Sequence, residues 1–437
     1  MKARLLSISS IFISLTLLLC AGCCKSGKEG AAVPVPRTIA VAQSGAADVI
    51  GNDNKALQQA ADMLRPGDTL IIGPGTYRLE NSVVIPVSGV VVRGTPGETV
   101  LLKGPGVSSK VVDGGDWGES DLVVAEPGKF SPGMGVAMLD DRNQGGYNVV
   151  VGTVLTIDAD TLRLSERSVN DLDYLDGNTR VENKFPLLCA FNARDIVIED
   201  LTADGNKDEN PTLLDGCRGG AFYLFNCRNC TLINCVARNY NGDGISFQIA
   251  DSVKVIGCEA YGNAGYGVHP GTGSSRSEIR NSHFHHNGQV GFFLCYRVRY
   301  GVFSDNLIEQ NGLYGISIGH KDTDNLFVNN TVRNNGFCGV YFRKNQIPVA
   351  GHRNVFRGNI IQDNGDARRG YGVYVEPHNQ DLVFENNTVA ETRPQDERTQ
   401  RYGFYVVRGS SSVKLLNNTM EGHLVSDFLD QNAKGTD

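Results

Sequence analysis

Three adjacent polar residues interrupt a regular stretch of this 437-residue sequence. The segment ISIGHKDTDN, residues 316–325, places His320, Lys321 and Asp322 in a row directly after an alternating apolar run. A histidine, a lysine and a carboxylate side by side can remove, donate or neutralise a proton, which are the tasks of acid–base catalysis. The same residue types also fill ordinary solvated turns, so the row is either part of a site or a surface loop.

A repeat of about 24 residues sets the elements that position this row. After each repeat glycine the side chains alternate between apolar and polar, which is typical of a short strand. Most of these glycines close turns such as NGDG and NGLYG, where Asn and Gly suit a left-handed backbone. The period is too short for a repeat that contains a helix, and it fits one coil of a parallel β-helix. The repeat glycines are Gly220, Gly244, Gly267, Gly291, Gly315, Gly339, Gly372 and Gly403.

A second feature of the repeat supports stacked coils. The fifteenth position after the glycine, with one deletion allowed, carries small or amide side chains in successive coils. We expect them to form a ladder inside the turns, which gives the cysteines among them a structural role. These residues are Cys235, Cys258, Ser282, Asn306 and Asn330.

The regions flanking the repeats predict a cap and an insertion. Leu57, Ala60, Ala61 and Leu64 share one helical face before Pro66-Gly67, so a capping helix is expected there. Residues 130–180 break the repeat and predict a small antiparallel insertion beside the groove, with a hairpin turn at residues 158–160. The cap and first coils then occupy residues 39–129, the repeats 181–425 and a tail 426–437.

The capping segment and the coils together resemble the pectate-lyase-like superfamily over most of residues 39–425. This resemblance implies an all-β, right-handed parallel β-helix with an N-terminal capping helix. The segment GYGVHPG also resembles the YG-apolar-Asp-Pro-His segment of alginate epimerases, but His269 replaces the acid and Gly271 the histidine. NGDGISF resembles the strand entries of polygalacturonases, with Asp243 as the single acid at that corner. Epimerase and hydrolase activities therefore remain alternatives.

The alternation directs one set of side chains outward and predicts a ligand class. Counting six residues from the repeat glycine stacks Lys321 over Arg297, with Arg343 and Lys344 in the next coil, a cationic strip about 10 Å long. The chain has a net charge of −7, so such a strip beside aromatic residues favours an anionic ligand, best a uronic-acid polysaccharide, and not nucleic acid. The predicted substrate contacts are Arg297, Arg343, Lys344, Tyr374, Glu376, His378 and Tyr405.

Cleavage of a uronate by β-elimination needs a base, a positive partner for the enolate and a proton for the leaving oxygen. We predict Lys321 or His269 as the base and Tyr341 or His320 as the acid. The arginines of the strip would hold the carboxylate, so that no cofactor is required. A non-catalytic glycan-binding or adhesive solenoid remains a further alternative.

A calcium ion could serve in place of the arginines. The segment DGNKDEN places the oxygen-bearing side chains of Asp204, Asn206 and Asp208 at alternate positions, an arrangement that suits calcium. Ordinary solvated turns share this pattern.

The N-terminus predicts export. Lys2 and Arg4 precede an apolar run and the sequence CAGCC, and residues 1–24 resemble a bacterial lipoprotein signal with lipid on Cys23. Residues 25–38 would tether the domain to the membrane of the bacterial cell envelope. Disulfides are permitted there, but the spacing of Cys227 and Cys230 does not indicate a zinc site. The oligomeric state is left open.

Overall fold

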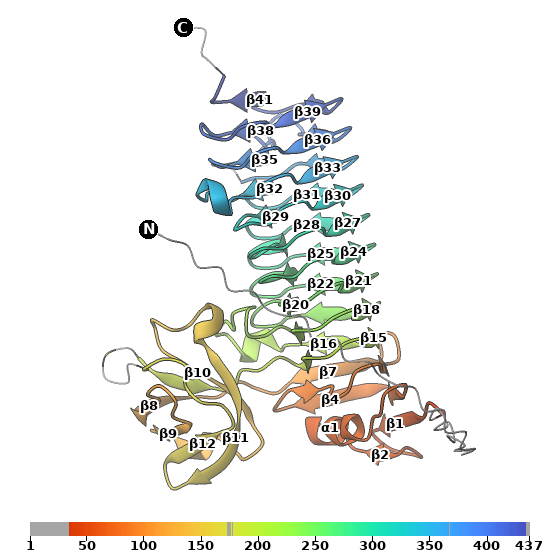
Figure 1. Cartoon of the computed structure of the whole chain (residues 1–437), viewed down its shortest axis with the longest axis vertical. Helices are drawn as coiled ribbons and strands as arrows, with labels where there is room; N and C mark the ends of the chain where they lie inside the picture. Colours follow the sequence, from red (N-terminus) through yellow and green to blue (C-terminus); the bar gives the residue numbers. More distant parts are fainter. Residues whose placement is uncertain (1–34, 173–175, 177, 367, 434–437) are drawn as a thin grey trace, which may run out of the picture. The chain divides into compact units, whose positions relative to one another are not determined.

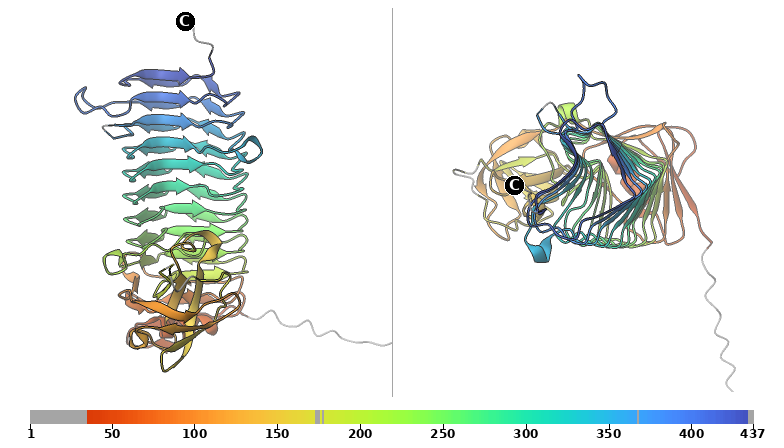
Figure 2. Two further views of the ribbon diagram at one scale, coloured as in Figure 1. Left: turned by 90° about the vertical axis from the view of Figure 1, so that its left-hand side faces the viewer. Right: turned by 90° about the horizontal axis from the view of Figure 1, so that it is seen from above.

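A computed structural model describes residues 35–172, 176, 178–366 and 368–433 of the chain. Within residues 36–433, three long parallel sheets wind into a solenoid, and a small closed barrel and one α-helix lie at its N-terminal end (Figures 1 and 2). The predicted all-β parallel β-helix with a capping helix and an antiparallel insertion is confirmed.

The three sheets, here named A, B and C, receive one strand from each complete coil. Sheet A contains, in spatial order, β2 (Val49–Ile50), β1 (Thr38–Ala42), β3 (Thr69–Ile72), β6 (Val91–Arg93), β15 (Val197–Glu199), β18 (Thr231–Ile233), β21 (Lys254–Ile256), β24 (Glu278–Arg280), β27 (Val302–Ser304), β30 (Leu326–Val328), β33 (Val355–Arg357), β36 (Val383–Glu385) and β39 (Lys414–Leu416). Sheet B contains β4 (Gly75–Leu79), β7 (Thr99–Lys103), β16 (Thr202–Asp204), β19 (Val236–Arg238), β22 (Glu259–Tyr261), β25 (His283–His285), β28 (Leu307–Glu309), β31 (Thr331–Arg333), β34 (Ile360–Gln362), β37 (Thr388–Ala390) and β40 (Thr419–Glu421). Sheet C contains β5 (Val83–Val84), β14 (Leu188–Phe191), β17 (Phe222–Phe225), β20 (Ile245–Gln248), β23 (Val268–Pro270), β26 (Val290–Phe293), β29 (Tyr314–Ile318), β32 (Cys338–Phe342), β35 (Tyr371–Val375), β38 (Tyr402–Val406) and β41 (Ser426–Asp430).

The core of the solenoid follows from the alternation that the sequence predicts. In sheet C, Ile316 pairs with Val340, Val340 with Val373 and Val373 with Phe404, and all four side chains are buried. Identical register in successive coils stacks these apolar side chains into continuous rows, which removes them from water. The strands of sheet C that follow the repeat glycines are therefore placed as predicted.

The predicted internal ladder is also confirmed, and it satisfies buried polar groups. Asn306 Nδ2 donates to Asn330 Oδ1 at 2.9 Å, and the backbone N–H of Cys258 donates to Ser282 Oγ at 3.1 Å. Buried amides of this kind cost stability unless they are paired. A second ladder, absent from the sequence prediction, runs between sheets B and C through Asn263, Asn287, Asn311, Asn335 and Asn364.

The repeat glycines do not have the left-handed backbone that the sequence predicts. All eight lie outside the positive-φ region, which is occupied instead by corner residues such as Asn234 and Asn329, with φ of 52° and 53°. Close packing explains the glycine at position 315. A Cβ there would lie 2.3 Å from Val332 Cγ1 and 2.7 Å from Gly339 O.

We expect Gly315→Val to destabilise the protein by about 1–3 kcal/mol, because the added atoms overpack a site with backbone on one side. Urea unfolding monitored by circular dichroism measures the change. Gly273→Val is a useful contrast, because a Cβ at that glycine meets nothing within 4 Å although its φ is 71°. If left-handed strain rather than packing governed the repeat, Gly273→Val would be the more damaging of the two variants.

The predicted cap is α1 (Asn54–Asp62). Asp53 caps it by accepting a hydrogen bond from the Ala56 backbone N–H at 2.9 Å. Leu57, Ala60 and Ala61 are fully buried, which is the face that the sequence indicates. The helix thus closes the open end of the apolar core.

The insertion is a closed antiparallel barrel that begins at Ser108 rather than at residue 130. Its hairpin turns where predicted, with Ala159 at φ 53°. The early start escapes the sequence because the segment from Ser108 is separated from the solenoid only by its antiparallel pairing within the barrel. The barrel strands, in spatial order, are β10 (Gly135–Leu139), β11 (Val150–Asp158), β12 (Thr161–Leu164), β9 (Asp121–Val124), β8 (Ser108–Gly114) and β13 (Arg180–Glu182).

The two ends of the chain complete the comparison with the predicted boundaries. Residues 426–430 form strand β41, which pairs with β38, so the last coil extends into the predicted tail. The predicted lipoprotein signal with Cys23, and most of the tether, lie outside the described residues. Among the residues that are described, no helix is long and apolar enough to cross a membrane.

Candidate functional site

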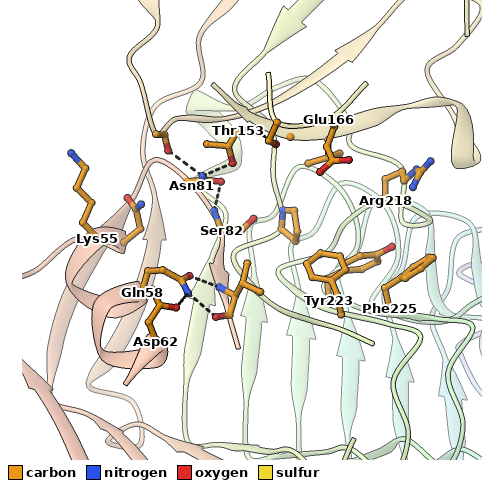
Figure 3. A pocket seen from close by; sticks show the side chains of 18 of the residues that line it. Lys55, Gln58, Asp62, Asn81, Ser82, Thr153, Glu166, Arg218, Tyr223 and Phe225 are labelled. Carbon is orange, nitrogen blue, oxygen red and sulfur yellow. Dashed lines mark hydrogen bonds between the residues drawn. The ribbon is translucent and has the colours of Figure 1, made fainter. Parts of the chain in front are cut away.

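A groove of about 960 Å³ lies between α1, the barrel and the first strands of sheet C. Its walls meet where Asn81 Nδ2 donates to Thr153 Oγ1 of the barrel at 2.9 Å. The insertion therefore flanks a groove, as the sequence predicts. Figure 3 shows α1 on one side of the groove, with Gln58 and Asp62, and sheet C on the other, with Tyr223 and Phe225; Arg218 comes from the loop before β17.

A column of outward side chains continues along sheet C from the groove. Its upper members, Tyr341, Tyr374 and Tyr405, occupy equivalent positions in adjacent coils and are half-buried. The rings of Tyr341 and Tyr374 are stacked at 5.7 Å with an interplanar angle of 9°. This geometry matches the predicted aromatic platform, and sugar binding there stays a prediction.

A second aromatic column, which the sequence analysis missed, runs beside the first. Tyr314, Tyr371 and Tyr402 each directly precede a repeat glycine, a signal that was available in the sequence. Tyr314 stacks on Tyr341 at 4.5 Å and Tyr371 on Tyr374 at 4.7 Å. Together the two columns form a wall of half-exposed rings.

The row His320-Lys321-Asp322 divides between the surface and the interior. His320 and Lys321 have left-handed backbones, with φ of 45° and 67°, whereas Asp322 is fully buried. The Asp322 carboxylate accepts hydrogen bonds from the backbone N–H groups of Val298 at 3.0 Å and Gly319 at 2.9 Å. Burial raises the pKa of Asp322 to about 7, against the opposing charge of a neighbouring arginine. Asp322 therefore stabilises the turn from inside, and the two residues before it, His320 and Lys321, remain accessible.

The predicted cationic strip is correct in its lower half. The backbone N–H of Arg297 donates to the backbone oxygen of His320 at 2.9 Å, and this pairing stacks Lys321 over Arg297. The prediction is wrong for Arg343 and Lys344, the upper half of the strip. The backbone N–H of Lys321 donates to the backbone oxygen of Val349, so the chain around η4 (Ile347–Val349) lies above Lys321 at this corner. Lys344 is exposed but outside the strip.

Arg343 is not an open carboxylate clamp. Its guanidinium donates to Ser317 Oγ at 2.8 Å, lies 3.3 Å from Asp322 Oδ2 and covers the ring of Phe293 at 4.5 Å. The side chain is only 14% exposed. Arg343 thus links three coils of the protein instead of facing a ligand.

An exposed group remains around Tyr296, which the sequence analysis did not single out. The Arg297 guanidinium lies 4.8 Å from the Tyr296 ring centre, and the His320 ring lies 6.0 Å from it. Burial and the charge of Arg343 lower the pKa of His320, so the imidazole is neutral at pH 7. Within the described residues, neither Arg297 nor Lys321 has a carboxylate within ion-pair distance. A neutral base therefore stands beside two uncompensated cations.

Beneath this group lies a buried aspartate–histidine pair. His269 Nδ1 is 2.6 Å from Asp243 Oδ2, and His269 is only 2% exposed. The backbone of Gly216 covers the pair so closely that a Cβ there would lie 1.7 Å from Asp243 Oδ2. His269 occupies the predicted outward position of its strand, but the 215–218 loop separates it from solvent, so it cannot be the predicted base.

Two cysteines distant in sequence complete the buried pair. Burial opposes charge on His269, but its hydrogen bonds with Asp243 and Cys295 outweigh burial and raise the pKa of His269 to about 10. The thiol of Cys217 lowers the pKa of Cys295, with burial opposing and His269 assisting. Both shifts favour the charged forms, a thiolate on Cys295 and an imidazolium on His269, and Cys295 is the partly exposed member.

The remaining predicted residues have structural partners. The Tyr341 hydroxyl donates to Glu376 Oε1 at 3.4 Å, and His378 Nδ1 lies 2.6 Å from Asn345 O. The Tyr405 hydroxyl accepts a hydrogen bond from Gln431 Nε2 at 2.6 Å.

The predicted calcium segment forms a closed turn. Asp204 pairs with Arg238 Nε at 2.7 Å and accepts the Asn206 backbone N–H at 3.0 Å, while Asp208 lies in the short helix η3 (Lys207–Glu209). Calcium binding there stays a prediction and would require the Arg238 ion pair to open.

Comparison with known protein families identifies the family to which this solenoid belongs. The family model described as right handed beta helix region matches residues 178–275, 212–351 and 349–428, more than half of the chain. The chain belongs to the right-handed β-helix family. No curated protein sequence matches this β-helix.

Solved structures similar to this right-handed β-helix show the same fold at low identity. The mannuronan C-5 epimerase AlgE6 A-module of Azotobacter vinelandii is 15% identical over 87% of this chain and 92% of its own, with a TM-score of 0.53. A polygalacturonase from Erwinia carotovora is 12% identical over 91% of this chain and 98% of its own, also with a TM-score of 0.53. A glycoside hydrolase is 12% identical over 87% and 96%, with a TM-score of 0.52.

Proposed function

We propose that this β-helix binds a carboxylate-bearing polysaccharide along the outer face of sheet C and cleaves it by β-elimination at the coil of His320. The observation that carries the proposal is the exposed group of His320, Arg297 and Lys321. His320 lies in the same coil as Tyr314, the first member of the second tyrosine column. Aromatic faces suit the apolar faces of sugar rings, and the cations suit their carboxylates.

The proposed mechanism assigns each requirement of elimination to an accessible side chain. Arg297 holds the uronate carboxylate, and Lys321 stabilises the negative charge that develops on it. Neutral His320 then removes the proton alpha to that carboxylate. The Tyr341 hydroxyl, one coil above on sheet C, is the proton donor for the leaving oxygen. These residues require no metal ion, and the neighbours named as a mannuronan epimerase and a polygalacturonase fit this ligand class.

Incubation with pectate, alginate and glycosaminoglycans tests the proposal. Elimination creates an unsaturated product that absorbs near 235 nm. Reducing ends without this absorbance would favour hydrolysis, and retention of the protein on the polymer without either product would favour a binding module.

We further propose that the protein is exported and anchored by lipid on Cys23 in a bacterial cell envelope. Replacing Cys23 with Ser removes the thiol that would carry the lipid, so the protein should move from the membrane fraction to the soluble fraction. Cys24→Ser, one residue further, is the matched control and should leave the distribution unchanged. Membrane association of the Cys23→Ser variant would contradict lipid attachment at this residue.

A further inference from the structure

A histidine and glutamate cluster lies on the outer face of sheet B, away from the residues proposed for catalysis. His283 and His285 alternate on strand β25, so both side chains face outward, and Glu259 pairs with His283 from the preceding coil. Each of the three offers a ligand atom, and these atoms lie within 4.8 Å of one another. All three residues are partly exposed, so the cluster is open to ions in solution.

Glu309 fixes the orientation of His283 from the following coil. Arg333 Nε lies 2.7 Å from Glu309 Oε2, which keeps this group a carboxylate, and Glu309 Oε1 lies 3.0 Å from His283 Nε2. A carboxylate only accepts, so Nε2 carries the proton and Nδ1 of the neutral ring keeps a lone pair. A carboxylate behind a histidine in this way is the usual support of a metal-binding imidazole.

The distance from His283 Nδ1 to Glu259 suits two ligands of one ion. His283 Nδ1 lies 3.9 Å from Glu259 Oε1, which is too long for a hydrogen bond. Two ligands on a tetrahedral zinc ion, each about 2.1 Å from it, are separated by about 3.4 Å. The His283 and His285 rings are stacked with their centres 3.9 Å apart, so a side-chain rotation that opens this stack brings the ligand atoms onto one ion.

His285 supplies the third ligand. Its Nε2 lies 2.9 Å from Glu259 Oε1, and its Nδ1 lies 2.7 Å from His286 Nδ1. Without a metal ion, a proton on His285 Nε2 makes this contact a hydrogen bond to the carboxylate. A metal ion can replace that proton when His285 Nδ1 carries the proton and donates to His286 instead.

We propose that Glu259, His283 and His285 bind one divalent transition-metal ion, with Zn²⁺ as the best fit. Two imidazole nitrogens and one carboxylate oxygen favour zinc over calcium or magnesium, which prefer oxygen ligands. Water completes the coordination. The ion would link strands β22 and β25 of neighbouring coils and so stabilise the folded solenoid. This role is independent of the proposed cleavage of polysaccharide.

Zinc uptake by the full-length protein tests the site. After dialysis against ZnCl₂ and removal of free ion, we expect one zinc per chain and a higher melting temperature than without zinc. His283→Gln and Glu259→Gln should each weaken binding by at least about 10-fold, and Glu309→Gln by about 10- to 100-fold. His352→Gln is the matched control, because this histidine lies outside the cluster with Nε2 on Ile347 O.

Other outcomes overturn the proposal. Absence of zinc uptake by the wild-type protein would do so, as would equal uptake by the wild type and both cluster variants. Because thiols also bind zinc, Cys295→Ser belongs in the same series. Uptake that is lost in Cys295→Ser but kept in His283→Gln would assign the ion to the cysteines instead.

Discussion

His320→Ala should reduce turnover of the cleaved polysaccharide by about 10²-fold or more, because the variant lacks the base that removes the alpha proton. The fold should survive, since His320 is exposed and its side chain lies outside the buried core. The rate of increase in absorbance near 235 nm, measured at saturating substrate, gives the effect on turnover.

The controls for this prediction separate chemistry from attraction. Arg297→Ala should mainly weaken binding, and the weakening should shrink at high salt because exposed charges are screened. Lys321→Ala tests the residue that the sequence favoured as base. A full loss of turnover in Lys321→Ala with normal turnover in His320→Ala would return the role of base to the lysine.

Asp243→Asn should destabilise the protein by about 3–5 kcal/mol at pH 7, because it replaces the carboxylate that pairs with the buried imidazolium of His269 by a neutral amide. Urea unfolding of both proteins measures the difference. Asp305→Asn is a suitable control, because Asp305 is an exposed corner residue and its replacement should cost within about 0.5 kcal/mol.

The pH dependence of this difference has a defined sign. The folded-state pKa of His269, about 10, lies above its ordinary value of 6.5. Its contribution to stability is therefore fully present below about pH 6.5 and is lost as the pH rises through about 10. The difference between wild type and Asp243→Asn should shrink over this range. A difference that stays constant from pH 6 to 10 would show that the pair does not depend on the His269 proton.

The repeat itself is readable in the sequence because it is a local property. The alternation of apolar and polar residues after each glycine, as in residues 316–318 and 340–342, indicates which side chains face the core. The 24-residue period places equivalent residues of successive coils in register. The ladder of Ser282, Asn306 and Asn330 follows from the same counting. Each coil contacts only its neighbours, so local pattern and period suffice to define the solenoid.

The position of the barrel boundary and the role of the glycines required the structure. The strand 108–114 is removed from the solenoid by its pairing with β9 and β13, which are not its neighbours in the repeat. The sequence pattern indicates that Gly315 is a turn residue. The structure shows instead that a glycine is required there because Val332 from the next coil approaches closely. Both facts concern contacts with chain segments that a local pattern does not contain.

The sequence by itself determined the fold, the outward tyrosine column and the stacking of Lys321 over Arg297. Only the tertiary structure decided which outward residues are accessible. Insertions between strands fold back over the wall, so the 215–218 loop buries His269 while His320 stays exposed. Likewise Arg343 folds onto Phe293 and Asp322, because a buried carboxylate attracts the nearest guanidinium. The physical reason is that register depends on the spacing of residues within a repeat, whereas exposure and charge pairing depend on loops that the repeat does not encode.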